Sequence, residues 1–166
     1  YSVFPVVDRE FLSSLFNPEK QDAHIPIWLY AFLSALSAAV IVQLNVTDLK
    51  ASDIGMPIEN GHDHRTFVRQ SIPGFSPQLF ISQCMQARQQ HAFIEEADEW
   101  TILTSFFLFV AHDNLIQPKS ASYYLREAIG FVEALRLGEP ESYMGLDADT
   151  EQRRRRLFWL LFVTER

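Results

Sequence analysis

The segment D-A-D-T-E-Q-R-R-R-R-L-F-W-L-L-F-V-T-E-R, residues 147–166, sets a run of charge directly before a run of apolar side chains. Its first acids and Thr150 predict a helix N-terminus. At about 100° per residue, four consecutive arginines span about 300° of a helix, so they cannot all share one solvated face. At least one must point into the protein and pair with a carboxylate or a carbonyl, because an unpaired buried charge is very costly. The four are Arg153, Arg154, Arg155 and Arg156.

The seven residues 157–163 are all apolar. They cover the whole circumference of a helix in two turns, and this pattern predicts a helix that is buried on every side. A nuclear localisation tract or a nucleic-acid patch is the alternative interpretation of the arginine run, but both need solvated arginines. The neighbouring acids and apolar residues therefore favour a structural role for the run.

Other apolar stretches with helical periodicity precede this segment. Ser76 and Pro77 are a typical N-cap and first helical residue, and Gly138 suits a helix C-terminus. We expect helices over 9–16, 25–44, 76–94, 100–112, 120–137 (with Ser120 or Ser122 as the first residue) and 147–166. No stretch alternates convincingly between apolar and polar residues. The predicted fold class is therefore all-α, an antiparallel array of about six helices in a single domain, residues 1–166.

Residues 25–44 contain no charged side chain, so a membrane span has to be weighed. Pro26, Tyr30 and Gln43 argue against it, and no basic cluster flanks the segment. Its small residues, such as Ala31 and Ala35, suit close packing against other helices. We expect the central core helix of the first half of the chain, and no membrane contact.

Residues 45–76 hold several turn-forming residues and predict one long loop, with a short helical turn over 65–70. Residues 95–99 form an acidic junction between two helices. Asn114 and Pro118 are expected to close the helix that precedes them.

The composition narrows the function. The net charge of −7 argues against direct binding of this chain to nucleic acid. The single cysteine, Cys84, permits no disulfide within the chain, and its apolar helical stripe indicates an inert buried thiol. The chain has no nucleotide-binding loop and no nucleophile elbow, and nothing in it supports an enzyme.

Histidines supply few metal ligands. His62-Asp63-His64 is the best group, but two further ligands are not evident, so a solvated loop is favoured and no metal is expected. His91 and Glu95 are spaced as a surface or capping pair, and His112 suits a helix C-terminus.

Three segments, taken in order, resemble the regulatory "middle homology" domain of fungal binuclear zinc-cluster transcription factors. Phe4 to Leu12 is similar to the opening of that domain, and Tyr123 to Gly138 is similar to a later helical segment. The arginine run with Trp159 and Glu165-Arg166 is similar to its most recognisable motif. Phe158 supplies the second of the paired aromatics that are common there. The resemblance implies that the chain contains only the N-terminal half of the family domain.

The resemblance also implies a regulatory, effector-responsive domain that works in the nucleus and controls transcription, with carbon-source metabolism as the expected pathway. Zinc and DNA would be bound by a separate N-terminal domain of a full-length protein, which would form a homodimer. The implied partner is a small-molecule effector or a co-regulator protein. A helical interaction scaffold without any ligand is the alternative function.

If a small effector binds, we expect it between the helices 28–44 and 100–112, where large rings stand beside small residues. Competing with this, the hydroxyls of such residues commonly bond back to carbonyls of their own helix. The polar groups of the expected pocket are Tyr30, Ser34, Ser37, Thr104, Ser105 and His112.

Overall fold

A computed structural model of the chain describes the backbone of residues 25–53 and 76–166 and the side chains of residues 25–44 and 76–166. These residues form no strand. The predicted all-α class is therefore confirmed, and the expected helix over 9–16 lies outside the described residues. The elements are α2 (Ile27–Asp53), α3 (Pro77–Gln89), α4 (Glu99–Asn114), α5 (Pro118–Ala134), the short 3-10 helix η2 (Pro140–Tyr143) and α6 (Ala148–Glu165).

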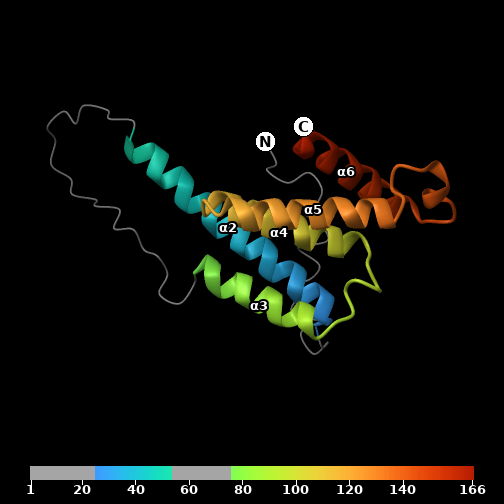
Figure 1. The fold of residues 1–166 in the computed structure, drawn as a ribbon, viewed down its shortest axis with the longest axis horizontal. Helices are drawn as coiled ribbons and strands as arrows, with labels where there is room; N and C mark the ends of the chain where they lie inside the picture. Colours follow the sequence, from blue (N-terminus) through green and yellow to red (C-terminus); the bar gives the residue numbers. More distant parts are fainter. Residues whose placement is uncertain (1–24, 54–75) are drawn as a thin grey trace, which may run out of the picture.

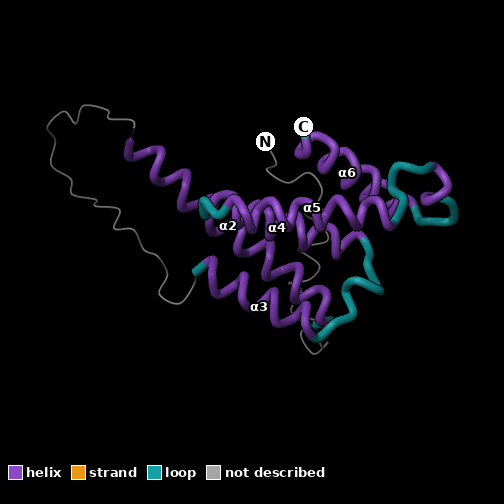
Figure 2. Tube along the Cα trace, viewed as in Figure 1, coloured by secondary structure: helices purple, strands orange, loops and turns teal. Residues whose placement is uncertain are grey.

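The helices form an antiparallel array (Figures 1 and 2). α2 packs against both α3 and α4, and α4 packs in turn against α5. α6 returns along α5 and touches α4 and α5 over a smaller area. Charges on α6 therefore reach the N-terminal end of α4, although many residues separate the two helices in the sequence.

The core lies where α2 crosses α4. On α2, Phe32 is completely buried together with three alanines, and on α4 Phe107 is almost completely buried. The rings of Phe32 and Phe107 have centroids 6.0 Å apart, and Trp100 meets Phe32 edge-on at 5.2 Å. Alanines on α2 let the two backbones approach closely, as its composition predicts. The three alanines are Ala35, Ala38 and Ala39.

The apolar part of α2, Ile27–Leu44, is long and apolar enough to cross a membrane, with a mean hydropathy of 2.0. In the structure this segment packs against α3 and α4 and provides the core residues just described. The core position accounts for the apolar residues on its buried face, and buried residues make up 44% of this segment.

α2 continues to Asp53, so the expected loop does not begin at residue 45. The physical reason is that residues 45–53 contain neither glycine nor proline, and the first such residues are Gly55 and Pro57. The rest of the expected loop and its short turn over 65–70 lie outside the described residues.

α3 begins as predicted and ends early. Its N-cap Ser76 accepts a hydrogen bond from the backbone N–H of Leu79, and Pro77 is the first helical residue. The helix ends at Gln89 and not at residue 94, and residues 90–96 form turns. This turn brings the ring of Phe93 to 4.0 Å from the guanidinium carbon of Arg88.

α4 is one residue longer at its N-terminus than expected. Asp98 caps it by accepting from the backbone N–H of Trp100 and Thr101, at 3.0 and 2.9 Å. The Thr101 hydroxyl completes a capping box with the backbone N–H of Asp98. Part of the expected acidic junction is therefore the start of this helix.

The predicted roles of Pro118 and Gly138 as helix stops are wrong, because at both places an earlier residue with a positive φ ends the helix. Asn114 is the last residue of α4, as predicted, but Pro118 is the first residue of α5, because the chain already turns at Ile116, which has φ 59°. α5 ends at Ala134, before Gly138, because Arg136 takes the left-handed position at φ 53°. At both ends the backbone N–H of the following residue returns to a carbonyl five residues back, a Schellman motif that does not require glycine.

Candidate functional site

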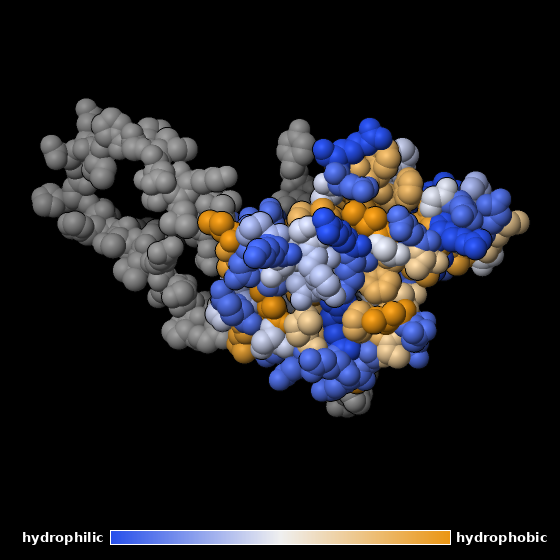
Figure 3. Space-filling model, viewed as in Figure 1, coloured by the Kyte–Doolittle hydropathy of each residue, from blue (hydrophilic) through white to orange (hydrophobic). Residues whose placement is uncertain are grey.

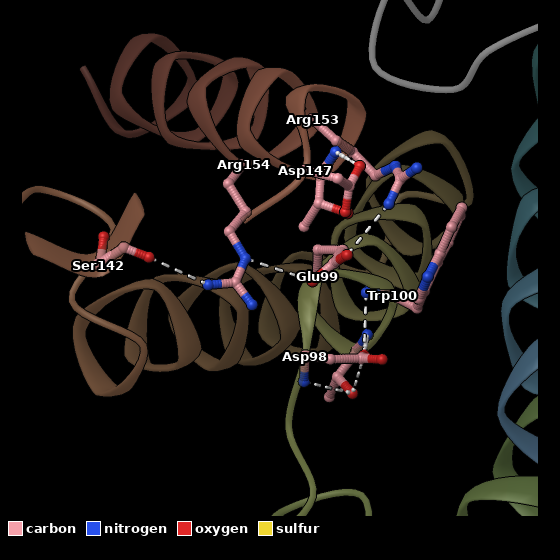
Figure 4. A network of polar contacts seen from close by, with 9 residues as sticks. Asp98, Glu99, Trp100, Ser142, Asp147, Arg153 and Arg154 are labelled. Carbon is pink, nitrogen blue, oxygen red and sulfur yellow. Dashed lines mark hydrogen bonds and ion pairs between the residues drawn. The ribbon is translucent and has the colours of Figure 1, made fainter. Parts of the chain in front are cut away.

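Glu99 is the carboxylate that two of the four arginines meet. It lies at the start of α4 with its side chain 9% exposed. Arg153 donates to one carboxylate oxygen at 3.0 Å, and Arg154 reaches the other at 3.4 Å (Figure 4). Arg154 also donates to the carbonyl of Ser142 at 3.4 Å. The guanidinium of Arg153 lies over the ring of Trp100 at 4.8 Å. One carboxylate thus ties α6 to α4, and its charge is favoured at a helix N-terminus.

The other arginines of the run point outward. Arg155 donates twice to Glu151 on its own helix, at 2.9 and 2.7 Å, and its side chain is 58% exposed. Its guanidinium also lies over the ring of Tyr143. Arg156 is exposed. The four arginines are therefore divided between an internal pair and an outer pair, as the 300° spread requires.

The expectation that residues 157–163 are buried on every side is wrong. Leu157 and Leu161 are buried, whereas Trp159 is 60% exposed and Val163 is 70% exposed. Only one face of α6 meets α4 and α5, so the opposite face has no described helix to pack on. Phe162 also lies on this exposed face, and the guanidinium of Arg166 lies 4.4 Å from the centre of its ring. Figure 3 shows hydrophobic residues of this helix directly beside strongly hydrophilic ones.

A second buried charge pair was not predicted from the sequence. Arg88 on α3 is 4% exposed and lies 2.6 Å from the carboxylate of Glu127 on α5, which is 15% exposed. The same carboxylate oxygen accepts from the hydroxyl of Ser105 on α4 at 2.6 Å. Three helices therefore share one polar network inside the core. A charged residue four positions after Cys84, on the same apolar stripe, was the signal available in the sequence.

This network sets the chemistry of the groups around it. Burial raises the pKa of the Cys84 thiol to about 12, against a partial opposing effect of the Arg88 charge. Burial also raises the pKa of Tyr124, whose hydroxyl lies 3.3 Å from the sulfur of Met85. Cys84 is completely buried, so it is a protonated, unreactive thiol at neutral pH.

A small cavity lies where α2, α3 and α4 meet. Its walls include Trp28, Arg88, His91, Trp100 and Thr104. The space open to the centre of a water molecule is about 20 Å³, which is room for about one water. This cavity is therefore too small to hold an effector without rearrangement.

A larger groove opens at the surface between α2 and α3. Its volume is about 390 Å³. It adjoins the small cavity, since Ile27 and Ala87 line both. Tyr30 comes from α2, and Gln83, Gln86 and Gln90 come from α3 or its C-cap.

The six expected effector-pocket residues do not gather in either of the two spaces just described. Thr104 lines the small cavity and Tyr30 lines the outer groove. Ser34 is buried and Ser37 is partly buried, but neither lines either space. The hydroxyl of Thr104 donates to the carbonyl of Trp100 at 2.8 Å. This is a bond back to its own helix, as the competing interpretation expects.

The last two of these residues have other partners. Ser105 lies 3.2 Å from the carbonyl of Thr101, besides its bond to Glu127. His112 has its Nδ1 2.6 Å from Gln117 and its ring stacked on Tyr124 at 5.2 Å. These contacts join α4 to α5 and to the segment between the two helices.

No group of three metal-ligating side chains occurs within residues 25–44 and 76–166. The His62-Asp63-His64 segment lies outside the described residues. His91 is paired with Glu96 at 3.6 Å, and not with Glu95 as its spacing suggested.

The fold and these contacts define a helical domain whose helices are joined by buried ion pairs. The sequence identifies the family, because residues 1–166 match the family described as "Fungal specific transcription factor domain". The chain belongs to this family, as its motifs indicated.

Its curated relatives include regulators of sugar use. The chain is 30% identical over 167 residues to "Probable sucrose utilization protein SUC1" of Candida albicans, covering 100% of this chain and 29% of the relative. It is 26% identical to "Maltose fermentation regulatory protein MAL13" of Saccharomyces cerevisiae, covering 100% of this chain and 30% of the relative. "Maltose fermentation regulatory protein MAL33" of the same yeast is 27% identical, with coverages of 100% and 31%. The chain thus spans about a third of the length of these relatives. No solved structure matches it.

Proposed function

We propose that this chain is part of the regulatory domain of a fungal zinc-cluster transcription factor that controls genes for the use of sugars. The observation that carries the proposal is the full-length family match, together with relatives named for sucrose and maltose regulation. On this proposal the chain itself catalyses no reaction. It acts in the nucleus as part of a larger, homodimeric DNA-binding protein, whose zinc is held outside residues 1–166.

The polar contacts support a role for the chain as a scaffold that transmits a signal. Glu99 joins α4 to α6, and the Arg88–Glu127 pair joins α3 to α5. Each pair links helices that are distant in sequence, so a displacement of one helix strains its contact with the helix that carries the partner charge. We take the arginine helix, including Trp159 and Arg166, as one structural unit of this scaffold.

A second candidate is a helical surface that binds a co-regulator protein without a small ligand. The exposed apolar face of α6, with Trp159 60% and Val163 70% exposed, favours it. The small size of the cavity between α2, α3 and α4 also favours a domain without a small ligand. Both candidates serve the control of transcription, and they differ in what the domain contacts.

The test of the proposed function is a deletion of the gene in the parent fungus. Transcripts and growth are compared on glucose, sucrose and maltose. We expect loss of growth and of transcript induction on one or both disaccharides, with normal growth on glucose. Unchanged transcripts on all three sugars would exclude the proposed pathway. A full-length Glu99→Gln variant then asks whether the charge at α4 is needed for induction, with Arg155→Ala as the matched surface control.

A further inference from the structure

The groove between α2 and α3 has the chemistry of a site for a neutral sugar. Its volume of about 390 Å³ falls within the usual range of small-molecule pockets, about 300–1,000 Å³. It is open at the surface, whereas the neighbouring cavity has room for about one water. Among the spaces just described, only the groove admits a ligand without repacking the core.

Three glutamine side chains line one wall of the groove. Gln83, Gln86 and Gln90 are spaced three and four residues apart, which places them on one side of α3. No hydrogen bond joins their side-chain amides to another residue of the described ranges 25–44 and 76–166. Each amide both donates and accepts hydrogen bonds. A sugar hydroxyl also does both, so a row of amides suits a row of hydroxyls.

The opposite wall carries Tyr30, which is 42% exposed. The face of an aromatic ring is negative and attracts the weakly positive C–H groups of a sugar ring. The hydroxyl of Tyr30 adds one more donor and acceptor. An aromatic platform opposite hydrogen-bonding amides suits a ring that has both C–H faces and hydroxyl edges.

Among residues 25–44 and 76–166, no charged side chain lines the groove. The charge of Arg88 lies at the neighbouring inner cavity and is engaged by Glu127 at 2.6 Å. A phosphorylated or carboxylated ligand would enter such a groove without a counter-charge and would lose its hydration there. The lining therefore selects a neutral polyol over an anion.

We propose that this groove binds a neutral mono- or disaccharide, with Gln83, Gln86 and Gln90 bonding its hydroxyls and Tyr30 stacking on its ring. The inference rests on the proposed function, since that function calls for a sugar effector. A ligand held by both walls stabilises the packing of α2 on α3, because binding to the folded state alone favours that state. The small cavity behind the groove lies beside Arg88, so the site adjoins the network that links α3 to α5.

The test uses the purified full-length regulator, titrated calorimetrically with sucrose and with maltose. We expect the wild type to bind at least one of them. The double variant Gln83→Met, Gln86→Met keeps the side-chain volumes and removes the hydrogen bonds, so binding should weaken at least about 10-fold. Gln89→Met is the matched control, because Gln89 is exposed on the same helix turn but does not line the groove. Its affinity should equal that of the wild type.

A reporter gene driven by the regulator is measured in parallel, and unfolding temperatures of all variants are compared. Equal affinities of the wild type and the double variant would overturn the groove site. So would a wild type that binds neither sugar although its reporter responds to them, because the sugar then acts indirectly. A reporter that responds to neither sugar would instead overturn the proposed function. If the double variant does not fold, Gln90→Met alone is used, with an expected loss of about threefold.

Discussion

The guanidinium of Arg88 lies 2.6 Å from the carboxylate of Glu127, and the two side chains are 4% and 15% exposed. In the packing order of the array, α3 and α5, which carry them, are separated by α2 and α4. The pair therefore spans the core, and Ser105 of α4 completes it from between. A buried pair of this kind adds little net stability over an apolar replacement, but loss of one partner strands the other charge.

Replacing Arg88 by Met should lower the free energy of unfolding by about 3–5 kcal/mol, because Glu127 is left as an unpaired buried charge. The measurement is urea unfolding followed by circular dichroism. Replacing both Arg88 and Glu127 by Met should cost less than the sum of the two single changes. Arg126→Met is the control, since Arg126 is exposed one residue away on α5. Additive single and double effects would contradict a direct interaction.

Glu99→Gln should lower the free energy of unfolding by about 1–3 kcal/mol, because two arginines lose the charge that holds them. Arg155→Ala should change it by less than about 1 kcal/mol, since its partner Glu151 lies on the exposed face of the same helix. The free energies of both variants are measured by urea unfolding followed by circular dichroism. Equal losses in the two variants would show that the division of the arginine run is wrong.

Ile116→Gly should raise the free energy of unfolding by about 0.5–1 kcal/mol. Ile116 has φ 59°, a conformation that is costly for a β-branched residue, and it is 87% exposed, so little packing is lost. Ile94→Gly is the control, because Ile94 is 64% exposed and lacks a positive φ. A thermal scan that finds Ile116→Gly less stable than the wild type would refute the strain argument.

Cys84 should react with a disulfide reagent at least about 100-fold more slowly in the native chain than in urea, because burial suppresses its thiolate. The sign of the pH effect follows from its pKa, which rises on folding from 9.0 to about 12. The native state therefore keeps a proton that the unfolded state releases. This contribution to stability is complete below pH 9 and is lost as the pH rises toward 12. Equal native and unfolded reaction rates at pH 8 would contradict the burial of the thiol.

The chain should bind duplex DNA negligibly, because its net charge is −7 and Arg153 and Arg154 are engaged by Glu99. Fluorescence anisotropy with random-sequence DNA at low salt measures this directly. Salt-sensitive binding below about 1 µM would contradict the prediction.

Features that depend on a few neighbouring residues were determined by the sequence alone. Ser76 and Asp147 cap helices where predicted, because an N-cap side chain bonds to backbone N–H groups only two or three residues away. The all-α class follows similarly from local periodicity. The spread of the arginine run also required an inward arginine, but it could not say which one or name the partner.

The tertiary structure alone decided which distant groups meet. Glu99 lies 54 residues before Arg153, and Glu127 lies 39 residues after Arg88, so no local pattern links them. The exposure of Trp159 was likewise decided by the position of α6, which meets other described helices on one side only. Periodicity reports the polarity of a helix face, whereas burial depends on the surface that the face finally meets.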